Sequence, residues 1–122
     1  MDPARDTPPW RQVVERVLGA VAAGELAAGD QLLSVRGMAA AAVVNHNTVA
    51  RAYRELEQLG VVRGENGRGV FVQADGPERA RELRRAETLQ SFRRAALDAL
   101  RAGHSMDALL AELAGEWNKE SA

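Results

Sequence analysis

Residues 45–72 read NHNTVARAYRELEQLGVVRGENGRGVFV, and this stretch decides the fold. Its first half predicts a helix that begins after Asn45, whose side chain is suited to an N-cap, and that ends at Gly60. Apolar residues recur at helical spacing and make one stripe: Val49, Ala52, Tyr53, Leu56 and Leu59. The opposite face carries polar and basic residues: Asn47, Thr48, Arg51 and Arg54. One side of this helix should therefore pack, and the other should stay accessible.

The second half predicts a short β-hairpin. Two triplets that favour strands, Val61-Val62-Arg63 and Val70-Phe71-Val72, flank the sequence GENGRG. Asn66-Gly67 is suited to a two-residue type I′ turn, because both central positions of that turn need a positive φ. This places Arg68, between two glycines, close to the tip of the hairpin.

Two further helices are predicted before this stretch. Apolar residues from Trp10 to Val21 recur at helical spacing, with Pro9 suited to the first helical position. Ser34 can cap a second helix that runs through Ala42, although Gly37 inside it costs about 1 kcal/mol relative to alanine. A helix, a tight connector and another helix form a helix-turn-helix, and the hairpin makes it a winged one.

The composition changes at Pro77 to an Arg/Glu/Ala/Leu-rich tail with two amphipathic helices. We expect a winged helix-turn-helix domain over 1–76 and a dimerisation tail over 77–122, in a fold that is mostly α with a small β-hairpin. Two amphipathic helices in about 45 residues, the first of them long, cannot enclose a core of their own, so a homodimer is the economical arrangement. The predicted dimerisation residues are Leu83, Leu89, Phe92, Leu97, Leu100, Leu109, Leu110, Leu113 and Trp117.

The polar face of the third helix has the chemistry needed to read DNA. A helix in the major groove reaches base edges with side chains near its N-terminus, as Asn47, Thr48 and Arg51 would do. Arg68 can lie against a phosphate or enter the minor groove. Arg36, near the start of the second helix, would sit over the DNA backbone. The local charge supports DNA binding modestly, because residues 34–68 contain five arginines and three acids in a chain whose net charge is −1.

Each of these residues also has a purely structural interpretation. Asn47 and Thr48 could simply cap the helix. Arg51 and Arg54 could pair with Glu55 and Glu57 as solvated helix charges, and Arg68 could be turn chemistry alone. The order of helix, helix and hairpin is what favours DNA binding over these readings.

Other classes of protein are disfavoured. The chain has no cysteine, no apolar run near the roughly 20 residues of a membrane span, and an acidic, Pro-rich opening, so we expect a cytoplasmic protein. An enzyme is not expected, because His46 and His104 lack paired-ligand spacing and GENGRGVF lacks the end of a phosphate loop. We expect no metal and no cofactor. A small-molecule effector stays open, although no convergent polar residues mark a site for one.

Residues 9–72 resemble the DNA-binding domain of the GntR family of bacterial transcription regulators. The resemblance rests on WRQV, GELAAGDQLLSVR, NTVARAYREL and GRGVFV. It implies a dimeric regulator, a repressor, on a palindromic operator, and the short tail resembles the YtrA-like branch. Together with the residue chemistry, it yields these predicted DNA contacts: Ser34, Arg36, Asn45, His46, Asn47, Thr48, Arg51, Gly67, Arg68 and Gly69. The alternative function is a winged-helix protein-interaction module without sequence-specific DNA binding.

The chain departs from the family pattern at four positions. Leu33 replaces a proline, and Gly37 replaces an acid, which removes the capping box. Val43 replaces the connector glycine, so that turn should be reshaped or strained. His46 stands where arginine is common, with a shorter reach and little charge near neutral pH.

Overall fold

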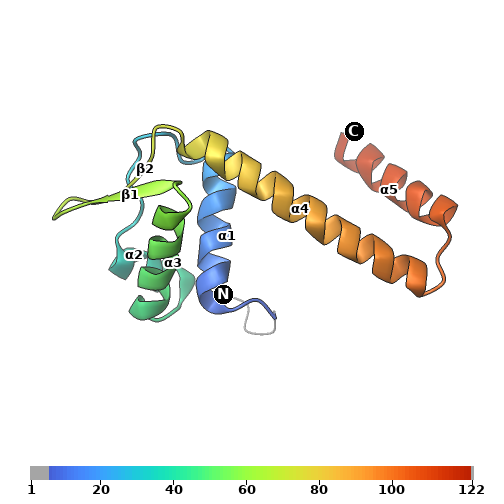
Figure 1. Cartoon of the computed structure of the whole chain (residues 1–122), viewed down its shortest axis with the longest axis horizontal. Helices are drawn as coiled ribbons and strands as arrows, with labels where there is room; N and C mark the ends of the chain where they lie inside the picture. The colour runs from blue at the N-terminus through green and yellow to red at the C-terminus, as the bar shows by residue number, and fades with distance from the viewer. Residues whose placement is uncertain (1–5, 122) are drawn as a thin grey trace. The chain divides into compact units, whose positions relative to one another are not determined.

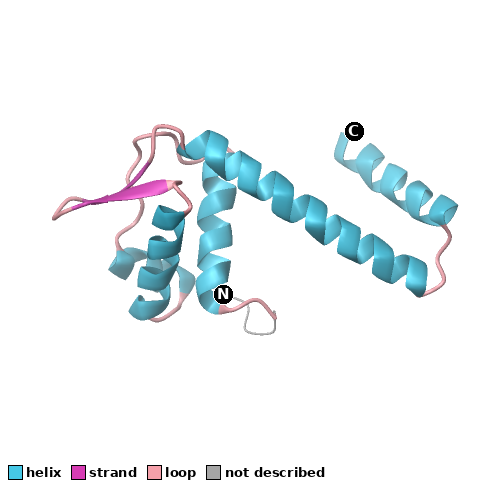
Figure 2. Cartoon of the chain, viewed as in Figure 1, coloured by secondary structure: helices cyan, strands magenta, loops and turns pink. Residues whose placement is uncertain are grey.

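The computed structural model describes residues 6–121, which form five helices and a two-stranded antiparallel sheet (Figures 1 and 2). The order is α1 Pro9–Ala22, α2 Val35–Ala42, α3 His46–Gln58, β1 Val62–Glu65, β2 Gly69–Val72, α4 Gly76–Arg101 and α5 Met106–Ser121. A mostly helical fold with one small hairpin was predicted, and the structure confirms it.

The core lies among α1, α2, α3 and the base of the hairpin. The apolar faces of α1 and α3 supply most of it, and α3 packs against both α1 and α2. Tyr53 of α3 is buried, and its hydroxyl donates a hydrogen bond to the Leu33 carbonyl at 2.7 Å. Burial raises the pKa of Tyr53 to about 12, so the neutral hydroxyl is retained as a donor. This bond holds α3 to the loop before α2.

The connector between α2 and α3 is strained at Val43. Ser34 Oγ caps α2 by accepting from the Gly37 N–H at 3.0 Å, and Asn45 caps α3. Between them Val43 adopts φ 55° and ψ 54°, the left-handed conformation. It is the one non-glycine residue with positive φ among residues 6–121. Of the two expected outcomes, strain is the one observed: the turn keeps a glycine-like geometry with a β-branched residue in it.

Replacing Val43 with glycine should stabilise the protein. The left-handed conformation costs about 1–2 kcal/mol for an L-residue, while glycine adds roughly 0.5–1 kcal/mol of chain entropy to the unfolded state. The side chain is 84% exposed, so little buried apolar area is lost. We expect a net gain of about 0.5–1 kcal/mol in the free energy of unfolding, measured by urea denaturation. The control Ala41→Gly, at an exposed helical position, should instead destabilise the protein. A lower free energy of unfolding in both variants would contradict the strain at Val43.

The hairpin forms the wing, but its turn differs from the predicted one. β1 and β2 pair with Val62 opposite Val72 and Glu65 opposite Gly69, which leaves the three residues 66–68 in the loop. The Arg68 N–H donates to the Glu65 carbonyl at 3.0 Å, with Gly67 at φ 72° and Asn66 outside the positive-φ region. The predicted two-residue type I′ turn is therefore wrong, because it needs positive φ at both central residues.

A segment before α2 extends the sheet on the other side of β2. The Val72 N–H donates to the Asp30 carbonyl, and the Leu32 N–H donates to the Val70 carbonyl, both at 2.8 Å. Gln31 pairs with Phe71 as an isolated bridge. These bonds brace the wing against the core along most of β2.

The chain divides into two compact units at Arg85 and Ala86, inside α4. The first turns of α4 belong to the winged unit, where Ala80 is fully buried and Leu83 packs against the core. The second unit contains the rest of α4 and α5, joined by a short turn. The predicted domain boundary, after Gly76, lies just past the first residue of α4 and stays a prediction.

Candidate nucleic-acid interface

One face of α3 is accessible and polar. Four of the five residues of its predicted apolar stripe are buried and Leu59 is partly buried. By contrast, Thr48 is partly exposed and four polar residues are exposed: His46, Asn47, Arg51 and Arg54. The hairpin follows α3 directly and extends away from the three helices (Figure 1). The wing and α2 are both neighbours of this helix, since α3 contacts β1 and α2.

The N-terminus of α3 is capped by Asn45. Its Oδ1 accepts from the Asn47 N–H at 2.7 Å, so this oxygen serves the helix. Within residues 6–121, the side chains of Asn47 and Thr48 make no hydrogen bond. The structural interpretation of these two residues as caps is therefore wrong, and both remain available to a partner.

The arginines of α3 are not neutralised by neighbouring acids. Glu57 instead accepts the Gly64 N–H at 3.1 Å and ties the wing to the helix. In the described part of the chain, neither Arg51 nor Arg54 forms an ion pair. The guanidinium of Arg51 lies over the ring of Trp10, with Cζ 4.2 Å from the ring centroid. Trp10 was predicted only as part of the apolar face of its helix.

The tip of the wing presents Arg68 to solvent. Its side chain is 75% exposed and forms an ion pair with Glu65 at 3.4 Å. Exposed pairs of this kind contribute about 0–1 kcal/mol, so a phosphate can replace the carboxylate at little cost. Both readings of Arg68, turn chemistry and DNA contact, are compatible with this geometry.

Gln31 braces the wing tip, a role that sequence reasoning missed. Its Nε2 donates to the Arg68 carbonyl at 2.9 Å, across 37 positions of sequence. Gly69 has φ 120°, and a Cβ there would collide with the Gln31 amide. Because Gly69 has no Cβ, the Gln31 side chain has room to hold the backbone of Arg68 by this hydrogen bond. No local pattern signals this contact.

The remaining predicted DNA contacts, Ser34 and Arg36, lie at the start of α2. Ser34 is exposed, but its Oγ already accepts a hydrogen bond from Gly37, and its hydroxyl hydrogen stays available as a donor. Arg36 is exposed and, in the described residues, has no ion-pair partner. The structure thus brings every predicted DNA contact to the surface of neighbouring elements: α2, α3 and the wing.

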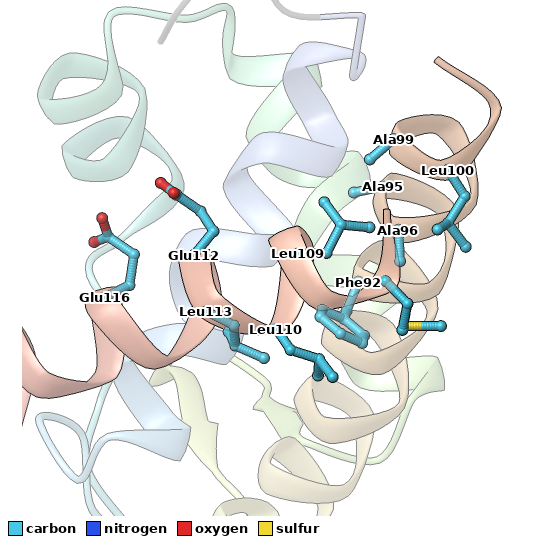
Figure 3. A pocket seen from close by; sticks show the side chains of 11 residues that line it. Phe92, Ala95, Ala96, Ala99, Leu100, Leu109, Leu110, Glu112, Leu113 and Glu116 are labelled. Atoms are coloured by element: carbon cyan, nitrogen blue, oxygen red, sulfur yellow. The ribbon is translucent and has the colours of Figure 1, made fainter. Parts of the chain in front are cut away.

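The second unit carries an open apolar groove of about 530 Å³ (Figure 3). Among the predicted dimerisation residues, Phe92, Leu100, Leu109, Leu110 and Leu113 line it. Leu89, Leu97 and Trp117 are exposed but do not line it. Leu83 differs from the other eight, because it packs against the core of the first unit.

Residues 6–121 contain no group of three or more His, Cys, Asp or Glu side chains that could hold a metal ion. No helix in 6–121 combines the length and the apolar character needed to cross a membrane.

Comparison with known proteins gives consistent results. Residues 9–72 match the model of "Bacterial regulatory proteins, gntR family". The HTH-type transcriptional repressor YtrA of Bacillus subtilis is 30% identical over 98% of this chain and 88% of its own length. A GntR family transcriptional regulator from Listeria monocytogenes has a TM-score of 0.81 at 27% identity, covering 94% of this chain and 98% of that one.

A solved structure of AraR(DBD) in complex with operator ORR3 shares the fold. Its TM-score is 0.54 at 19% identity, covering 59% of this chain and 87% of that one. At this identity the similarity concerns the fold alone.

Proposed function

The chain belongs to the GntR family, in its short YtrA-like branch, and is a DNA-binding transcriptional regulator rather than an enzyme; from this premise we propose that it represses transcription as a homodimer on a palindromic operator. The proposal places it in the bacterial cytoplasm. The observation that carries it is the accessible face of α3, where Asn47 and Thr48 make no side-chain hydrogen bond within residues 6–121, beside a braced wing that carries Arg68.

The roles of the residues follow from their positions. Asn47, Thr48 and Arg51 would read base edges in the major groove, with His46 beside them at the start of α3. Arg68 would contact the strand next to the wing, with Gly67 and Gly69 allowing close approach. Ser34 and Arg36 would hold the phosphate backbone at the start of α2. Asn45 would act through its cap, which fixes the first turn of the reading helix.

The tail supplies the reason to expect two copies. Five predicted dimerisation residues line the apolar groove, and Leu110 and Leu113 remain 56% and 51% exposed in the single chain. Charge favours a second copy as the occupant. Residues 86–101 contain three arginines and two acids, whereas α5 contains four acids and one lysine. A dimer in which the two grooves pack against each other would bury these apolar side chains. Opposite charges of the two copies would then meet at the edge of the contact.

Selection of bound duplexes from a random library tests the proposal. A symmetric dimer should enrich an inverted repeat whose half-sites lie about 10 base pairs, or 34 Å, apart. Enrichment of a single unrepeated site would contradict the dimer, and failure to enrich any sequence would contradict specific binding.

Affinity for the selected duplex should fall steeply with salt. If the dimer neutralises about eight phosphates, its affinity should fall by roughly 10³–10⁵-fold between 50 and 200 mM salt. Fluorescence anisotropy at a series of salt concentrations measures the slope. Arg36→Ala should reduce the slope by about 2, one phosphate contact per copy. The control Arg81→Ala removes an exposed arginine of α4 and should leave the slope unchanged. If Arg36→Ala also left the slope unchanged, this would contradict the placement of Arg36 on the DNA backbone.

A further inference from the structure

We propose that Trp10 is a positioning residue for sequence reading: its indole holds the guanidinium of Arg51 in one plane, ready for a guanine. The inference rests on the proposed function and adds a residue from α1, a helix to which that function assigns no part.

The two side chains meet although they come from different helices. Arg51 Cζ lies 4.2 Å from the centroid of the Trp10 ring, within the range of a cation–π contact. In residues 6–121 no carboxylate competes for Arg51. The ring is therefore the partner that limits where this guanidinium can go.

The ring is itself held in place. Trp10 is partly buried and packs against the hydrophobic core. Pro9 occupies the first position of α1, and the buried Gln12 donates to the Thr7 carbonyl at 2.9 Å, which fixes the start of the helix. Because α1 packs along α3, the indole is a rigid platform beside the reading helix.

Stacking leaves the arginine able to bind. A guanidinium stacks through its flat face, while its N–H donors point outward in its plane. With its flat face on the ring, Arg51 would lose rotamer freedom but keep its donor edge for the O6 and N7 atoms of guanine. An arginine immobilised in advance loses less entropy on binding, so the ring should increase both affinity and selectivity.

A double-mutant cycle tests this with the full chain and the selected duplex. Trp10→Leu, which keeps apolar bulk but removes the ring's π-system, should weaken binding by about 2- to 10-fold. The Arg51→Ala variant identifies the guanine that Arg51 contacts, because it no longer distinguishes this base from others. Trp10→Leu should reduce the loss of affinity that follows when that guanine is replaced. Trp10→Phe should retain most of the affinity. In the Arg51→Ala background, Trp10→Leu should cause no further loss.

Two results would overturn the inference. One is unchanged affinity in Trp10→Leu. The other is an equal loss with and without Arg51, because this would show that Trp10 only supports the fold.

A measurement without DNA separates this inference from the proposed function. The Nε–H proton of Arg51 should show an upfield ring-current shift in the NMR spectrum, lost in Trp10→Leu, while that of Arg54 is unchanged. Absence of the shift would overturn the inference even if the operator is bound. A protein that shows the shift but selects no duplex would contradict the proposed function, and the positioning role with it.

Discussion

Replacing Arg51 and Arg68 together with alanine should abolish operator binding while the protein stays folded. A bidentate contact to guanine is worth about 1–3 kcal/mol, and a dimer would lose two of them besides two contacts at the wing. We expect affinity to fall by at least 10²–10⁴-fold, as roughly 1.4 kcal/mol corresponds to a factor of ten. Titration of the selected duplex at fixed salt measures this loss.

The fold should tolerate these changes. Arg68 loses only an exposed ion pair with Glu65, and Arg51 loses only its contact with Trp10. The matched control is Arg81→Ala with Arg101→Ala, which removes the same charge from two exposed, ion-paired arginines of α4. Equal losses in the two double variants would mean that net charge, rather than this face, governs binding.

Replacing Leu110 and Leu113 with glutamate should convert the dimer into monomers. Both side chains line the apolar groove, so a dimer closed over it would bury four carboxylates without partners. Each buried, unpaired charge costs several kcal/mol, so a contact between the two grooves should not form. Analytical ultracentrifugation should show a single chain at micromolar concentration. Operator affinity should drop as well, because one copy can grip only one half-site.

The control places the same charges elsewhere on the same helix. Ala108→Glu with Ala111→Glu keeps the spacing of three residues but lies outside the groove, at exposed positions. This variant should remain dimeric. If the groove variant also stays dimeric, or if both become monomeric, the groove is not the contact between copies.

The helices and the wing were predictable because local patterns and tertiary packing agree. The apolar stripe of α3 and the caps Ser34 and Asn45 specify the helices by short-range chemistry. The strained Val43 was also foreseeable, since the connector needs a left-handed residue whichever side chain stands there. The family match confirms the predicted family, its branch and the absence of an enzymatic function.

The turn of the wing could not be read from its residues alone. Asn66-Gly67 has the propensity for a two-residue turn, but β1 and β2 pair in a register that leaves three residues between them. That register is set by the core positions of Val62 and Val72, both fully buried. Tertiary packing therefore outweighs the local preference of the dipeptide.

Contacts between distant parts of the chain were equally hidden. Gln31 reaches Arg68 from the segment beside β2, and Trp10 reaches Arg51 from α1. Neither pair has a spacing that marks it, because the fold alone brings the partners together. These contacts involve the two arginines on which the account depends most.

The central claim is that the N-terminal turns of α3 and the tip of the wing lie against DNA. Backbone amide spectra of the ¹⁵N-labelled protein, recorded as the selected duplex is added, test it most directly. We expect the largest shifts at 46–51 and at 67–69, with smaller changes at Arg36 and little change in α5. Shifts concentrated on other surfaces, with those amides unmoved while the duplex is bound, would contradict the account.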